Sequence, residues 1–205
     1  MNLLMTFGEP TTDRRAARHE ATKAEIVEAA WALAREHGLA GVSLRDLAKR
    51  VGMQPPSLYS YFPSKHAIYD AMFAQGYEAL LDLRRRTQVP DDPREAVRVM
   101  AHQFLAFCVE DPARYQLLFQ RTIPGFEPSE ESYALATEVL GVTSTYLDRA
   151  GAGDAESRDL WTALLTGLAD QQISNDPGGD RWVRLVDTAV DMFLDSRGQT
   201  RRRRR

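Results

Sequence analysis

Apolar residues recur along most of this chain at intervals of three and four positions, which is the spacing of an amphipathic helix. No stretch alternates apolar and polar residues for long enough to predict a strand. The pattern therefore predicts an all-α fold of about nine helices. They are expected at about 22–37, 44–51, 55–61, 64–86, 97–110, 112–119, 130–149, 155–173 and 179–196.

Breaks in this pattern predict how the chain is organised. Thr22 and Glu25 have the spacing of a capping box, which predicts that the first helix begins there. The arginine run at the end has no apolar partner residues, so we expect a disordered tail. The expected parts are a flexible arm at 1–20, a head at 21–66, a helical body at 67–197 and the tail at 198–205.

The head contains a pair of short helices with the steric pattern of a helix-turn-helix, which needs a small residue at the helix crossing and a flexible residue in the turn. Counted from Leu44 as position one, Ala48 is the small residue at five and Gly52 is the turn glycine at nine. The apolar positions four, eight, ten, fifteen and eighteen are then filled by Leu47, Val51, Met53, Leu58 and Tyr61.

The second helix of this pair carries polar groups suited to DNA. Gln54, Ser57 and Ser60 can hydrogen-bond base edges or phosphates, and the hydroxyls of Tyr59 and Tyr61 can donate to the phosphate backbone. Lys65 lies in the first turn of the next helix, where a bound phosphate would offset its unfavourable interaction with the helix dipole. The full set of expected DNA-binding residues is Arg45, Gln54, Pro55, Ser57, Leu58, Tyr59, Ser60, Tyr61 and Lys65. Packing roles for the tyrosines, or a solvated Lys65, are the alternatives.

Residues 22–70 resemble the N-terminal domain of the TetR/AcrR family of bacterial regulators. The matching segments are 26–30 (IVEAA), 41–48 (GVSLRDLA), 51–52 (VG), 58–59 (LY), 61–62 (YF) and 64–65 (SK). The resemblance implies a three-helix head whose third helix enters the major groove. It also implies phosphate contacts from Tyr59, Tyr61 and Lys65, and frequent DNA contact from Arg45. Two departures are Ala34, where the family usually has an aromatic residue, and the prolines Pro55 and Pro56, which lack amide hydrogens.

Charge and composition narrow the function further. The net charge is −3, but residues 1–65 carry 9 Lys and Arg against 7 Asp and Glu, whereas 66–195 carry 11 against 22. Such a chain favours DNA binding at the head alone. One cysteine, no apolar run near the roughly 20 residues of a membrane span, and no signal peptide predict a cytoplasmic protein. Because metal-ligand spacing, phosphate loops and nucleophile motifs are all missing from the sequence, we expect neither an enzyme nor a bound metal or cofactor.

The body is expected to form a homodimer, which would place two heads about one DNA turn apart on a palindromic operator. Residues 111–119 (DPARYQLLF) and Trp161 with Gly167 resemble a TetR subgroup with a Trp…His-Gly signature, although Thr166 replaces the histidine. By analogy with the family, the last two helices form the dimer interface. Its expected residues are Leu164, Leu168, Trp182, Leu185, Val186, Ala189 and Phe193.

Aromatic residues of the body suggest a cavity for a small apolar effector, although each of them could equally be ordinary core. The expected ligand-binding residues are Phe104, Phe107, Cys108, Tyr115, Phe119, Tyr133 and Trp161. Few charged residues are expected to face this region, which favours an apolar effector over an anionic one. The functional prediction is a ligand-released repressor; an activator and a helical protein-interaction module remain the alternatives.

Overall fold

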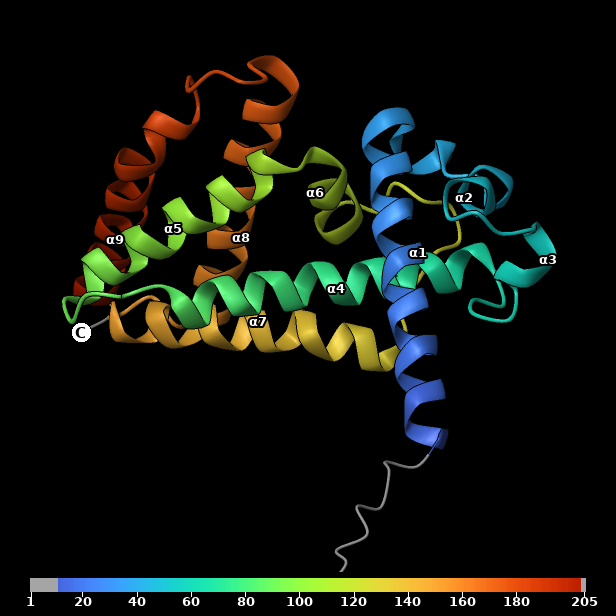
Figure 1. Ribbon diagram of the computed structural model, residues 1–205. Helices are drawn as coiled ribbons and strands as arrows, with labels where there is room; N and C mark the ends of the chain where they lie inside the picture. Colours follow the sequence, from blue (N-terminus) through green and yellow to red (C-terminus); the bar gives the residue numbers. More distant parts are fainter. Residues whose placement is uncertain (1–10, 204–205) are drawn as a thin grey trace, which may run out of the picture. The chain divides into compact units, whose positions relative to one another are not determined.

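The computed structural model describes residues 11–203, and their side chains from 14 to 198. The described chain contains nine α-helices, one short 3-10 helix and no strand, which confirms the predicted all-α fold (Figure 1). The helices are α1 (Thr11–Gly41), α2 (Leu44–Arg50), α3 (Pro55–Leu58), α4 (Lys65–Arg86), α5 (Pro93–Glu110), α6 (Pro112–Phe119), α7 (Glu130–Arg149), α8 (Ala155–Asn175), η1 (Val183–Leu185) and α9 (Val186–Arg203).

Two compact units make up the molecule. One reaches Met72 and the other begins at Phe73, so the division falls inside α4, a few residues beyond the predicted boundary after residue 66. We refer to them below as the head and the body, and each is described by itself.

The head is organised around a small apolar core. Ile26 and Ala30 of α1, Leu47 of α2 and Leu58 of α3 are all buried, with at most 1% of their surface exposed. Ser43 begins α2 by accepting a hydrogen bond from the Asp46 amide at 3.1 Å, which satisfies one free N–H of the first turn.

The first helix differs from the prediction, because it begins at Thr11 rather than at Thr22. The Thr22 hydroxyl donates to the carbonyl of Arg18 at 3.0 Å, a bond from residue i to i−4 that belongs to a helix interior. The same residue type serves as a cap or as an interior residue, so the pattern alone was misleading. The expected flexible arm is therefore wrong for residues 11–20, and residues 1–10 lie outside the described part of the chain.

The body is built around α5, which packs against α7, α8 and α9. In Figure 1, α8 and α9 are joined at one end by the turn after Asn175, and α5 lies against both. The pairing of α5 with α9 is reinforced by a ladder of ion pairs on the surface. The ion pairs join Arg94, Arg98 and His102 of α5 to Asp187, Asp191 and Asp195 of α9.

The last predicted helix, 179–196, is interrupted at its start and extended at its end. A turn precedes the 3-10 helix, and the buried Gln172 holds it by accepting hydrogen bonds from the amides of Trp182 and Val183, at 2.8 and 3.2 Å. Helix α9 then continues to Arg203, so the expected disorder is wrong for 198–203. Residues 204 and 205 lie outside the described chain.

Candidate nucleic-acid interface and internal cavities

The helix-turn-helix pattern of the sequence corresponds to a real crossing of α2 and α3. Ala48 is 1% exposed, as the predicted crossing position requires. Gly52 has a φ of 68° and no atom within 4 Å of a Cβ placed on it. The glycine is therefore needed for the left-handed backbone of the turn, because L side chains rarely adopt it, and not for lack of space.

Helix α3 ends at Leu58 and not at the predicted residue 61, and the segment from its N-cap Gln54 to Ser60 displays most of the residues expected to read DNA. Gln54, Ser57, Tyr59 and Ser60 are exposed, and 53% of the surface of Tyr59 is accessible. Pro55 and the following proline occupy the first turn, as expected, and Gln54 makes no side-chain capping bond. The Ser60 hydroxyl donates to the carbonyl of Ser57 at 2.7 Å, so it is left to act as an acceptor.

Leu58 is the exception, because only 1% of its surface is exposed. Its side chain holds α3 against the rest of the head and is not available to DNA. The expectation that Leu58 contacts DNA is therefore wrong, and its role is the apolar one that position fifteen of the motif assigns.

Tyr61 is half-buried and stacks on His19, with ring centroids 4.8 Å apart and planes inclined by 24°. This contact brings the N-terminal half of α1 beside the end of α3. Arg15 lies one helical turn before His19 on the same face, and Arg18 is adjacent to it. Sequence reasoning missed these arginines, although alanine and arginine between 14 and 18 have high helix propensity.

Lys65 has a partner within the head. Its ammonium donates to the Ala40 carbonyl at 3.3 Å and lies 5.3 Å from the ring centre of Tyr69, which itself donates to Leu39 O at 2.6 Å. Ala40 lies two residues after Gly38, whose φ of 73° and ψ of 164° interrupt α1 where the sequence predicted its end. The Lys65 ammonium therefore has an acceptor inside the protein, whether or not it also contacts a phosphate.

Arg45 on α2 is exposed and makes no ion pair or hydrogen bond with any described residue. Arg50, by contrast, donates to the Glu36 carboxylate at 2.7 Å. Of these two arginines, Arg45 is the one with a guanidinium available to an external phosphate.

The body contains a cavity of about 260 Å³, lined by residues of α4, α5, α6, α7 and α8. Three predicted ligand-binding residues, Phe104, Phe119 and Trp161, line it. A second pocket of about 460 Å³ adjoins it and shares Tyr77, Leu118 and Phe119.

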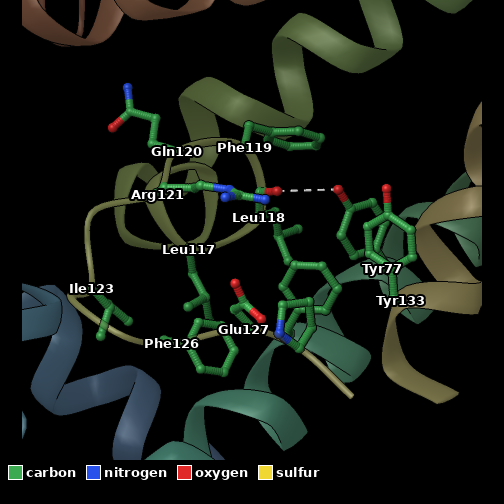
Figure 2. Close-up of a pocket in the computed structure, with 12 residues that line it drawn as sticks. Tyr77, Leu117, Leu118, Phe119, Gln120, Arg121, Ile123, Phe126, Glu127 and Tyr133 are labelled. Atoms are coloured by element: carbon green, nitrogen blue, oxygen red, sulfur yellow. Dashed lines mark hydrogen bonds between the residues drawn. The ribbon is translucent and has the colours of Figure 1, made fainter. Parts of the chain in front are cut away.

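Tyr133 lines this second pocket and lies near Tyr77 at one side, with Ile123 and Phe126 across from them (Figure 2). Tyr77 donates to the Leu118 carbonyl at 3.1 Å, and burial raises the pKa of its hydroxyl. The second pocket is the more polar of the two, because the exposed Arg121 and Glu127 are among its lining residues.

Three of the predicted ligand residues line neither of these pockets. Phe107 is buried beneath Arg114, whose guanidinium carbon lies 3.8 Å from the ring centre. Cys108 is fully buried, and burial raises the pKa of its thiol. Tyr115 donates to the Thr166 carbonyl at 3.1 Å. These residues are core, which is the alternative that the sequence left open.

Few charged residues were expected to face the cavity region, and among the residues that line the 260 Å³ cavity one is charged. It is Arg84, with 8% of its surface exposed, which was not among the predicted residues. The sequence contained a signal for this, because Tyr77, Leu80, Leu81 and Arg84 follow helical spacing and are all buried. Arg84 is followed by Arg85 and Arg86, so the three arginines together resemble a solvated charged run at the end of a helix.

The expected dimer residues fall into two groups. Val186, Ala189 and Phe193 are buried within the single chain, and the Phe193 ring lies 5.2 Å from that of Trp161. They belong to the core and not to a free surface, which corrects the prediction for those three. Leu164, Leu168 and Trp182 are half-buried, and Leu185 is 38% exposed. The exposed apolar residues Leu160 on α8 and Met192 on α9 were not predicted.

The described residues offer neither a metal-binding cluster nor a membrane-spanning helix. No group of three or more His, Cys, Asp or Glu side chains within that range could hold a metal ion. No helix in the described range has the length and apolar composition needed to cross a membrane.

Comparison with known proteins identifies the family. Residues 26–72, which contain the helix-turn-helix, match the profile "Bacterial regulatory proteins, tetR family". The chain is 32% identical over 184 residues to the HTH-type transcriptional regulator Rv1816 of Mycobacterium tuberculosis, covering 83% of this chain and 76% of that protein. It is 25% identical over 170 residues to the HTH-type transcriptional repressor KstR of Rhodococcus jostii, covering 83% and 77%.

The fold agrees with this assignment. The crystal structure of the regulatory protein SCO4313 superposes with a TM-score of 0.71 at 22% identity, covering 88% of this chain and 98% of the other. That likeness concerns the fold alone, whereas the match to Rv1816 extends over both units. The chain therefore belongs to the TetR family of DNA-binding transcription regulators and is not an enzyme.

Proposed function

We propose that this protein is a repressor that binds a palindromic operator as a homodimer and is released by a small molecule held in the body. The DNA-binding part of the proposal rests on α3: the buried Leu58 anchors it, while Gln54, Ser57 and Tyr59 face outward. A polar surface of this kind on a rigid helix pair is suited to a DNA groove.

Different side chains are assigned to affinity and to sequence choice. Tyr59, Tyr61, Lys65 and Arg45 would bind phosphates, because they carry hydroxyl or cationic donors beside α3. Gln54 and Ser57 would read base edges, since their side chains make no bond within the described chain. The first turn of α3 contributes little through its backbone, because its two prolines have no amide hydrogen.

Arg15 and Arg18 extend the proposed phosphate surface. The stacking of His19 on Tyr61 holds their part of α1 next to α3, and both arginines are exposed. Cations in this position would increase affinity for any duplex without choosing a sequence.

The dimer is proposed to form through the outward faces of α8 and α9. Leu160, Leu164 and Leu168 follow one face of α8, and Gly167 has open space where a side chain would project. Met192 is 69% exposed on α9 and would add apolar area to such an interface. A twofold dimer would match the symmetry of a palindrome.

Release by a ligand would follow if the ligand binds best to a state whose heads do not fit the operator. The cavity lined by Phe104, Phe119 and Trp161 is the proposed ligand site. As a regulator of genes, the protein is assigned to the cytoplasm, where bacterial DNA lies.

The test is footprinting and fluorescence anisotropy on the DNA upstream of the protein's own gene. We expect protection of a palindrome and a steep loss of affinity with salt. Arg45→Gln should weaken binding to every duplex, whereas Gln54→Ala should lower the preference for the operator over other sequences. Arg86→Gln, on an exposed arginine of the body, serves as the matched control for Arg45. No duplex binding at low salt would instead favour a protein-interaction module.

A further inference from the structure

A single cation lines the body cavity, which was expected to bind an apolar effector. Arg84 has 8% of its surface exposed and lines the cavity together with Phe104, Trp161 and Leu165. Among the described residues that line the cavity, it is the only one with a formal charge at neutral pH. The remaining lining is aliphatic, aromatic or hydroxylated.

The guanidinium of Arg84 lacks an anion. Its Nη1 donates to the Met100 sulfur at 3.4 Å, a weak acceptor, and its Nε is buried with no hydrogen-bond partner. The nearby Glu138 is paired with Arg85 at 3.3 Å. Burial lowers the pKa of Arg84 to about 10, so the group remains protonated at neutral pH. A buried charge without a partner destabilises a fold, and this one is compensated by no carboxylate of the described chain.

The threonine hydroxyls of the cavity cannot donate freely. The hydroxyls of Thr143, Thr162 and Thr166 donate to backbone carbonyls of their own helices, at 3.0, 2.9 and 2.7 Å. Of the donors without an acceptor along the cavity, those of Arg84 are the charged ones, since the indole N–H of Trp161 is neutral. A ligand that fits must supply an acceptor there, and a negative one is favoured because hydrogen bonds between charged groups are the strong ones.

We propose that this cavity binds an anionic amphiphile, whose carboxylate or phosphate head pairs with Arg84 and whose apolar body lies against Phe104, Trp161 and Leu165. The head would accept hydrogen bonds from the guanidinium, which suits both anions geometrically. The cavity of about 260 Å³ is slightly smaller than typical small-molecule sites, roughly 300–1,000 Å³, which points to a short or medium chain. That this ligand acts as a regulatory signal rests on the proposed function, in which a ligand releases the protein from DNA.

The binding test compares molecules that differ only in the head group. Hexanoate, octanoate and decanoate, the alcohols of the same lengths, and octyl phosphate are titrated into the full-length chain by calorimetry. We expect at least one anion to bind about tenfold or more tightly than its alcohol, since a hydrogen bond to a charged group contributes about 1.5–3 kcal/mol. The carboxylate and phosphate arms show which head the cavity prefers. If no anion exceeds its alcohol at any length, the proposal is wrong.

Arg84→Met removes the charge and keeps an apolar side chain of similar length. It should abolish the preference for the anion and leave alcohol binding in place, and it should raise the melting temperature of the free protein, because an unpaired buried cation is removed. Arg85→Met is the matched control, since Arg85 is adjacent but has 63% of its side chain exposed, and it should keep the preference. A preference that survives in Arg84→Met would overturn the assignment. Should that variant not fold, Arg84→Lys retains the charge without the planar fork and should weaken anion binding severalfold.

Operator binding, measured on the same samples, separates this inference from the proposed function. If an Arg84-dependent anion binds and the operator stays bound, the cavity assignment stands and ligand release is wrong. If alcohols release the operator as well as anions do, release stands and the anion assignment is wrong.

Discussion

The head and the body place their functional side chains in opposite ways. In the head, the candidate residues are on the surface of a short helix held by a small core: Tyr59 is 53% exposed beside a Leu58 that is 1% exposed. In the body, the candidate binding group is inside, and Arg84 is 8% exposed. A surface site depends on local spacing and can be inferred from sequence, whereas a cavity between helices depends on which helices meet.

The largest expected effects come from replacing a buried alanine by leucine in each unit, which should weaken DNA binding in the head and ligand binding in the body. Ala48→Leu overfills the crossing of α2 and α3, at a cost of about 1–3 kcal/mol, and should displace α3 and reduce operator affinity by about tenfold or more. Ala136→Leu fills the body cavity and should reduce ligand affinity instead. Anisotropy on the operator and calorimetry on octanoate are the two measurements. The comparison fails if Ala48→Leu affects the ligand as strongly as the DNA.

Much of the head could be predicted because its determinants are local. Ala48 and Gly52 are required by sterics within 20 residues, and the structure places them as the spacing indicates. Where the head was misjudged, one residue type served two purposes. Thr22 has the spacing of a cap and lies in a helix interior, and Leu58 lies in the reading helix but faces the core.

The body could be predicted only as a set of helices. Helix α7, Glu130–Arg149, has the expected bounds, because flanking loops define it locally. Which helices pack against α7 across the cavity depends on contacts between residues far apart in the sequence. The apolar periodicity of a single helix does not encode these contacts. This is why Phe107 and Cys108 were expected in a pocket they do not line, while Arg84 was missed.

Removing one tyrosine hydroxyl from each unit should separate affinity from stability. Tyr59→Phe deletes an exposed hydroxyl, and we expect a severalfold loss of operator affinity with little change in melting temperature, because the net contribution of one hydrogen bond is about 0.5–1.5 kcal/mol. Tyr115→Phe deletes a buried donor to Thr166 O and should lower the melting temperature without changing intrinsic DNA affinity. An unchanged affinity for Tyr59→Phe would leave that tyrosine without a phosphate role.

Salt dependence should tell the phosphate contacts of the head from its internal bonds. Lys65→Ala removes one cation, and the slope of log affinity against log salt should fall by about one unit if Lys65 reaches a phosphate. Arg15→Gln should act in the same way. Because Lys65 also donates to Ala40 O, the variant should lose some stability as well. A lower melting temperature with an unchanged salt slope would mean that Lys65 stabilises the head and does not contact a phosphate.

The smallest expected effect concerns a cap in the body and its dependence on pH. The Asp154 carboxylate begins α8 by accepting from the Ser157 hydroxyl and amide, at 2.7 and 3.0 Å, and these bonds lower its pKa. A carboxyl whose pKa is lower in the folded state adds stability above its unfolded pKa of about 4, and this is lost as the pH falls through the folded value. Asp154→Ala should therefore cost roughly 0.5–1 kcal/mol at pH 7 and progressively less below pH about 4. Ser129→Ala, at the cap of α7, is the control, since its hydroxyl does not titrate and its cost should persist in acid. Thermal melts from pH 7 down to 3 measure both, and parallel losses for the two variants would contradict the assignment to the carboxylate charge.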